Sequence, residues 1–61
     1  MNGKAVKEAM RREGYTYRSL AEAAGIGVAT LSMALNHERD IQLSNFKSIC
    51  NVLGIDPKEV W

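Results

Sequence analysis

The residue types that could perform catalysis are present in this 61-residue sequence, but nothing organises them into an active site. The candidate nucleophiles and bases are Ser19, Ser32, Ser44, His37 and Asp40. Nucleophilic catalysis also needs an element that aims the nucleophile at its base, such as a glycine-rich elbow. Acid and base catalysis by carboxylates needs two of them in one cleft. The sequence contains no such elbow, phosphate-binding loop or carboxylate pair, so we predict that the protein is not an enzyme.

The sequence also excludes the covalent and metal links that stabilise many small domains. Cys50 is the only cysteine and His37 the only histidine, which rules out an internal disulfide and a four-ligand zinc site. We expect Cys50 to be a small buried residue, since it lies on an apolar helix stripe. Stability must therefore come from apolar packing, which favours helices in so short a chain. No cofactor or small-molecule ligand is indicated.

The basic residues are concentrated at the N-terminus. Residues 1–20 contain five basic and two acidic residues, a local charge of +3, whereas the whole chain carries +1. The residues concerned are Lys4, Lys7, Arg11, Arg12 and Arg18, against Glu8 and Glu13. This asymmetry indicates an anionic partner for the N-terminal half of the chain. The alternative is that these side chains form only a solvated helix face.

The length and composition predict one small water-soluble domain that covers residues 1–61. Hydrophobic residues make up 46% and charged residues 25% of the chain, which is ordinary for a globular protein and argues against disorder. No apolar run approaches the roughly 20 residues of a membrane span. The charged N-terminus lacks the apolar stretch of a secretory signal. We therefore expect a cytoplasmic protein.

Glycine and proline divide the sequence into segments with helical spacing of apolar residues. We expect a compact all-α bundle of five short helices, over residues 4–13, 17–24, 28–36 and 45–53 and in a short element from 57. The predicted helix terminators are Gly14, Gly25 and Gly54, and the predicted caps are Thr16, Ser44 and Asp56. The predicted core residues are Val6, Ala9, Met10, Leu20, Ala21, Ala24, Ile26, Leu31, Ala34, Leu35, Ile41, Leu43, Phe46, Ile49, Cys50 and Leu53. Trp61 is expected either to cap this core or to make a dimer contact.

Residues 17–36 combine a short helix, a glycine turn and a second short helix, which is a helix-turn-helix pattern. This segment closely resembles the DNA-binding motif of the phage repressor and Cro family, also called the XRE family. The matching residues are Leu20-Ala21, Gly25, Leu31 and Asn36. The resemblance spans nearly the whole chain, because Leu43-Ser44-Asn45-Phe46 and Leu53-Gly54-Ile55-Asp56-Pro57 also match. It implies a lambda-repressor-like fold and a sequence-specific DNA-binding regulator of transcription, with repression as the expected outcome.

The resemblance implies that helix 28–36 enters the major groove of DNA. The residues expected to face bases are Val28, Ala29, Ser32 and Met33, with Thr30 near the end that enters the groove first. The resemblance further implies phosphate contacts from Tyr17, Asn36 and the amides near Ser44 and Asn45. By their positions, the basic residues Arg11, Arg18, Arg39 and Lys47 could reach flanking phosphates, with Lys4 and Lys7 more distant.

The base-facing positions depart from the family pattern, in which Gln, Arg, Asn or Lys is frequent. Val28, Ala29 and Met33 can contact thymine methyl groups but cannot form bidentate hydrogen bonds with bases. We therefore expect sequence preference to depend on thymine methyls, on Ser32 or Thr30, and on DNA shape.

The same apolar face also fits a different function, namely a protein-interaction module such as an antitoxin or antirepressor. Members of the family usually read two-fold operators as dimers and often dimerise through the region after the fourth helix. In this chain that region contains Val60 and Trp61. We therefore expect a homodimer on a two-fold operator.

Overall fold

The computed structural model describes residues 1–37 and 41–61, and all the regular structure in these residues is helical. The elements are α1 (Gly3–Glu13), α2 (Tyr17–Ala24), α3 (Val28–Asn36), α4 (Leu43–Leu53) and the single-turn 3-10 helix η1 (Pro57–Glu59). The prediction of an all-α fold is confirmed. The expected number of five helices is wrong, because the fifth element is only one 3-10 turn.

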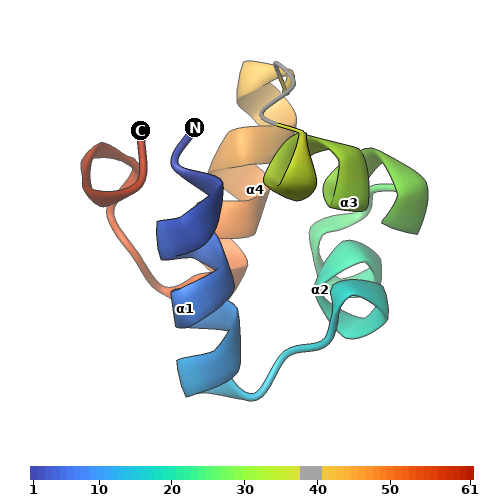
Figure 1. The fold of residues 1–61 in the computed structure, drawn as a ribbon, viewed down its shortest axis with the longest axis horizontal. Coiled ribbons are helices and arrows are strands. Elements are labelled where there is room, and N and C mark those ends of the chain that lie inside the picture. Colours follow the sequence, from blue (N-terminus) through green and yellow to red (C-terminus); the bar gives the residue numbers. More distant parts are fainter. Residues whose placement is uncertain (38–40) are drawn as a thin grey trace.

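The short fifth element begins as predicted but ends after one turn. The Asp56 carboxylate accepts a hydrogen bond from the Lys58 amide at 3.0 Å, which is the expected cap. Val60 then turns its side chain into the core, and its carbonyl accepts a hydrogen bond from the Asn2 amide at 2.6 Å. Burial of Val60 therefore ends the helix and brings the two ends of the chain side by side (Figure 1).

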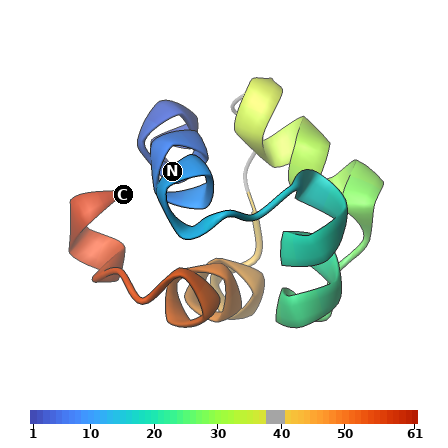
Figure 2. The same cartoon turned by 90° about the horizontal axis from the view of Figure 1, so that it is seen from below.

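Helix α4 packs against α1, α2 and η1, while α3 packs against α1 and α2 (Figures 1 and 2). The buried core cluster consists of Val6, Ala9, Met10, Leu20, Ala21, Leu31, Leu35, Phe46, Ile49, Cys50, Leu53 and Val60. Ala34 is also buried, and Ala24, Ile26 and Ile41 pack against the cluster while half-buried. The helical periodicity of the sequence therefore identified most of the core correctly.

The start of α4 differs from the prediction. The helix begins at Leu43 and follows Gln42, whose side chain makes no capping hydrogen bond. Ser44 therefore lies inside the helix and is not its cap. Leu43 is 56% exposed and does not belong to the core, because it lies one turn before Phe46, beyond the edge of the apolar cluster. The Trp61 ring meets Phe46 edge-on at 5.3 Å between ring centres, yet remains 73% exposed.

A close backbone approach at Gly3 joins the start of α1 to the end of α3. A Cβ atom added at Gly3 would collide with the backbone carbonyl oxygen of Leu35 and lie 3.2 Å from its carbonyl carbon. Only a residue without a side chain therefore lets the two helices approach this closely.

Replacing Gly3 with alanine should destabilise the fold, although alanine is the better helix former. The added methyl must push two backbones apart, and overpacking of this kind typically costs about 1–3 kcal/mol. In a domain of this size each kcal/mol lowers the melting temperature by about 4–8 °C, which circular dichroism can measure. Lys4→Ala, at the exposed neighbouring position, is the control and should melt close to the wild type. An unchanged melting temperature for Gly3→Ala would contradict the close approach.

Candidate nucleic-acid interface

A tight turn through residues 25–27 sets α3 against α2. Gly25 ends α2 in the left-handed conformation (φ +74°), which favours glycine. The next amide, that of Ile26, donates to the Ala21 carbonyl at 2.9 Å, and the Ile26 side chain packs against the core. At the other end of α2, the Thr16 hydroxyl accepts a hydrogen bond from the Ser19 amide at 3.1 Å. The Ser19 hydroxyl accepts one in return from the Thr16 amide at 2.9 Å. Both ends of α2 are therefore held locally, so that it forms a firm support for α3.

Helix α3 buries one side and presents the other to solvent. Its buried residues are Leu31, Ala34 and Leu35. None of the five residues predicted to face bases is buried: Val28, Ala29, Thr30 and Met33 are exposed, and Ser32 is half-buried. Val28 and Met33 are unusual in this respect, because these large apolar side chains are 41% and 38% exposed.

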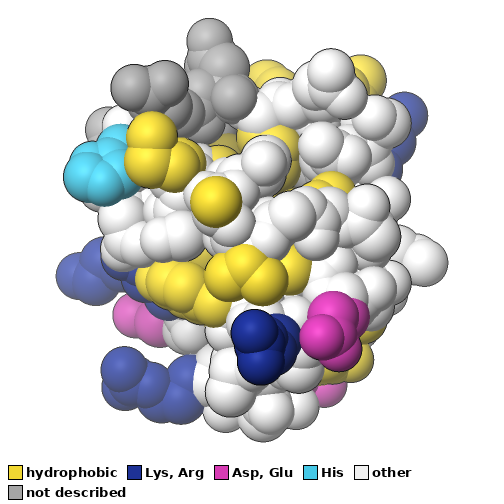
Figure 3. Space-filling view, turned by 90° about the vertical axis from the view of Figure 1, so that its right-hand side faces the viewer, with side chains coloured by type: hydrophobic (Ala, Val, Ile, Leu, Met, Phe, Trp, Pro, Cys, Tyr) yellow, Lys and Arg dark blue, Asp and Glu magenta, His cyan; other side chains and the backbone are white. Residues whose placement is uncertain are grey.

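The outward side of α3 carries no charge, since the helix contains no acidic or basic residue. Figure 3 shows the face formed over α2 and α3, with hydrophobic side chains gathered in its middle, basic and acidic side chains below them, and further Lys and Arg side chains toward its edges. The uncharged outward side of α3 itself adds no repulsion against a polyanion, and the acidic side chains of this face lie below it, beside basic ones.

A chain of hydrogen bonds connects the far end of α3 to the start of α2. The Tyr17 hydroxyl donates to the Asn36 side-chain oxygen at 3.4 Å. The Asn36 amide nitrogen donates in turn to the Ser32 carbonyl at 3.0 Å and lies 3.3 Å from the Ser32 hydroxyl. Two of the predicted phosphate-facing residues, Tyr17 and Asn36, are thus brought together. Their polar groups already have partners within the protein, so a phosphate must compete for them.

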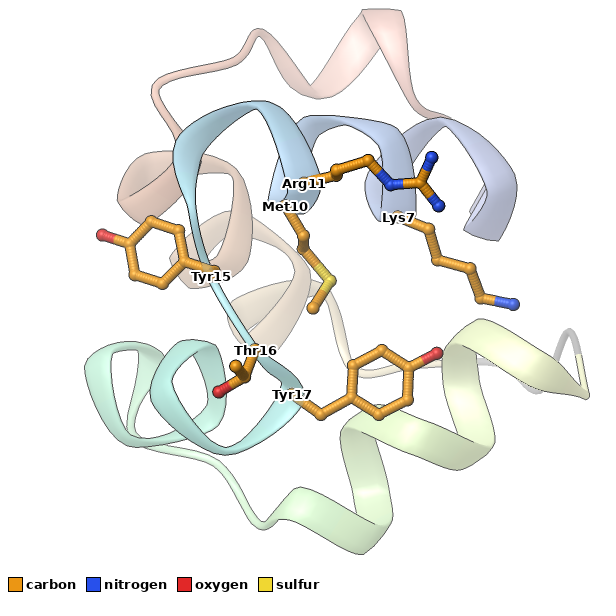
Figure 4. Close-up of a pocket in the computed structure, with 6 residues that line it drawn as sticks. All are labelled: Lys7, Met10, Arg11, Tyr15, Thr16 and Tyr17. Atoms are coloured by element: carbon orange, nitrogen blue, oxygen red, sulfur yellow. The ribbon is translucent and has the colours of Figure 1, made fainter.

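Tyr17 also lies in a surface cleft between α1 and the start of α2, with a volume of about 370 Å³ (Figure 4). The lining residues are Lys7, Met10, Arg11, Tyr15, Thr16 and Tyr17. Arg11 is exposed and was predicted to contact phosphate, whereas Lys7 is half-buried and was expected to be more distant. The sequence feature that groups Lys7 with Arg11 is their spacing of four residues, which places both side chains on one face of α1.

The other predicted phosphate-facing residues are dispersed. Arg18 is exposed in the first turn of α2, and Ser44 and Asn45 lie in the first turn of α4, exposed and half-buried respectively. Lys47 is exposed but lines a separate groove of about 270 Å³ beside Trp61 and η1. Arg39 lies outside the described residues.

Among residues 1–37 and 41–61, no group of three His, Cys, Asp or Glu side chains could hold a metal ion. No helix in these ranges is both long and apolar enough to span a membrane. Burial, reinforced by the negative charge of Asp56, raises the pKa of the Cys50 thiol, so the thiol stays protonated and unreactive at neutral pH.

Comparisons with known proteins agree with this geometry. A family model described as helix-turn-helix matches residues 6–60. Among curated proteins, no sequence matches significantly. Among solved structures, the fold resembles the N-terminal DNA-binding domain of SinR from Bacillus subtilis, with a TM-score of 0.90 at 23% sequence identity. That match covers 98% of this chain and 88% of the SinR domain.

Proposed function

The chain belongs to the XRE family of helix-turn-helix domains, and we propose that it is a transcriptional repressor that binds double-stranded DNA sequence-specifically. In this proposal α3 enters the major groove, which is about 12 Å wide and admits a helix. The observation that carries the proposal is the outward side of α3, where Val28 and Met33 remain exposed on a helix that carries no charge. The protein acts as a binding domain and not as an enzyme.

Base recognition is proposed to depend on methyl groups more than on hydrogen bonds. Val28, Ala29 and Met33 provide apolar contacts for thymine methyls, while Thr30 and Ser32 add hydroxyl groups. Selection of bound DNA from a random pool should therefore yield a thymine- and adenine-rich consensus that tolerates single substitutions. The same experiment tests the proposed dimer, since a homodimer should select two inverted half-sites about one helical turn apart. A guanine-rich consensus with a steep loss at each substitution would refute this mode of readout.

Phosphate contacts are proposed to supply the part of the affinity that does not depend on sequence. The residues assigned to this role are Arg11, Tyr17, Arg18, Asn36, Arg39, Ser44, Asn45 and Lys47. Arg11 has no carboxylate partner among the described residues, whereas Arg12 pairs with Glu13 at 3.9 Å. Substitutions of Arg11 and of Arg12 therefore form a matched pair, in which one removes a charge unpaired in the described part of the chain and the other a paired charge from the same helix.

The affinity for DNA should fall steeply with salt. With about four to six phosphate contacts, the logarithm of affinity should decrease with the logarithm of salt concentration at a slope of about −4 to −5. Arg11→Gln should make this slope shallower by about 1. Arg12→Gln removes the same charge from the same helix and should leave the slope unchanged. Fluorescence anisotropy with labelled DNA measures both slopes, and a flat dependence in the wild type would remove these residues from the interface.

The second candidate function is a protein-interaction module such as an antitoxin or antirepressor. It is favoured by the same exposed side chains, Val28 and Met33, because apolar residues at the centre of an exposed face also suit a protein partner. The two functions differ in how far they depend on the basic side chains of the protein. A purely apolar protein interface should largely ignore Arg18, whereas DNA binding should not.

A further inference from the structure

The cleft between α1 and the start of α2 combines two cations with an apolar wall. Lys7 and Arg11 project from adjacent turns of α1, and neither forms an ion pair within residues 1–37 and 41–61. Lys7 is half-buried, since a lysine can lay its aliphatic stem along the protein surface while the ammonium stays in water. Met10, which is buried, and the half-buried ring of Tyr17 form the body of the cleft. Such a combination can take a ligand with an anionic group and an apolar part.

The polar ends of three side chains lie on one side of this cleft. In Figure 4 the Lys7 ammonium and the Tyr17 hydroxyl point toward the end of α3, the Arg11 guanidinium lies along α1 on the same side, and the Tyr15 ring turns to the opposite side. The Tyr17 hydroxyl donates to Asn36 at 3.4 Å, which is long for a hydrogen bond between oxygens and therefore weak. The hydroxyl can exchange that bond for one to a charged oxygen with a net gain.

We propose that this cleft binds a small phosphomonoester with an aromatic body, of the nucleoside monophosphate class. Lys7 and Arg11 together supply two positive charges, which match the charge of about −1.5 to −2 on a phosphomonoester at neutral pH. A phosphodiester in the DNA backbone carries only one negative charge. The guanidinium of Arg11 binds two phosphate oxygens, Lys7 contributes a point charge, and the Tyr17 hydroxyl donates to a third oxygen.

The size of the cleft supports a ligand larger than a phosphate group. Its volume of about 370 Å³ falls at the lower end of the roughly 300–1,000 Å³ of small-molecule sites. A lone phosphate would leave the space beside Met10 and the Tyr17 ring unfilled. A flat heterocycle fits there, with stacking on the tyrosine ring as its main contact.

Occupation of the cleft competes with DNA. Arg11 and Tyr17 are among the residues assigned above to backbone phosphates, so a bound phosphomonoester removes two DNA contacts. This regulatory step rests on the proposed function, whereas binding of the ligand itself does not.

Nuclear magnetic resonance titration with adenosine 5′-monophosphate tests the site. We expect saturable shifts of the backbone amides of Lys7, Arg11, Thr16 and Tyr17. Adenosine and inorganic phosphate, titrated separately, should each bind at least about fivefold more weakly. Lys7→Gln and Arg11→Gln should each weaken binding of the nucleotide about fivefold, because each removes a charged contact. Arg12→Gln is the matched control and should leave the affinity unchanged.

The site is overturned if the nucleotide causes no saturable shifts, if inorganic phosphate binds as tightly, or if Arg12→Gln weakens binding as much as Lys7→Gln. Displacement of labelled DNA by the nucleotide tests the regulatory step, and nucleotide binding with unchanged DNA affinity overturns that step. If the protein binds no DNA, the proposed function fails while the titration still decides the ligand site. If DNA binds and the nucleotide does not, the further inference fails alone.

Discussion

Replacing Met33 with glutamate should abolish measurable binding of the selected DNA while leaving the fold intact. Met33 is 38% exposed and does not belong to the buried core cluster, so the change leaves that cluster intact. In the proposed complex a carboxylate at this position is brought against the negative field of the groove, and an opposed like charge costs several kcal/mol at an interface. A loss of about 2.7 kcal/mol corresponds to a hundredfold weaker affinity. Anisotropy measures the binding, and circular dichroism verifies the helix content.

Two further variants make this result specific. Arg18→Glu reverses a charge in the first turn of α2 and should also weaken DNA binding strongly, because it places a carboxylate near phosphates. Ser48→Glu adds the same negative charge on α4, outside the set of residues assigned to DNA, and should have a smaller effect. Wild-type affinity in Met33→Glu would rule out α3 as the helix in the groove. The interaction module would be favoured instead if Met33→Glu abolished binding of a protein partner and Arg18→Glu did not.

Replacing Leu31 with alanine should unfold a large fraction of the protein. Leu31 lies only two residues from Met33 but is fully buried between α3 and the rest of the core. Truncation of a buried leucine costs about 2–5 kcal/mol, since the cavity that remains is only partly filled by relaxation. A single core in a chain below about 70–80 residues rarely supplies more than about 3–5 kcal/mol. The variant should therefore show a much lower urea midpoint and reduced helix content at 37 °C.

Met33→Ala is the control for this experiment. It removes apolar volume from the same helix on the exposed side, where substitutions usually change stability by less than about 0.5 kcal/mol. A Leu31→Ala midpoint no lower than that of Met33→Ala would contradict the assignment of the buried side of α3. Together, the five substitutions at residues 18, 31, 33 and 48 separate effects on stability from effects on recognition.

The sequence by itself determined the helices and most of the core, because both depend on interactions between near neighbours in the chain. Gly14, Gly25 and Gly54 end three helices in the left-handed conformation, as their positions predicted. Thr16 and Asp56 cap the elements that follow them. The start of α4 was misplaced at Ser44, because a helix can also begin after a residue such as Gln42 that offers no capping side chain.

Only the tertiary structure decided which faces of different helices meet. Helical periodicity shows that Lys7 and Arg11 share a face of α1, but it does not reveal that Tyr17 lies across the cleft from them. The Tyr17 to Asn36 hydrogen bond spans 19 positions of sequence, and the approach of Gly3 to Leu35 spans still more. Contacts of this kind depend on the angles at which helices pack. Those angles are set by the side chains of the whole core and not by any single segment.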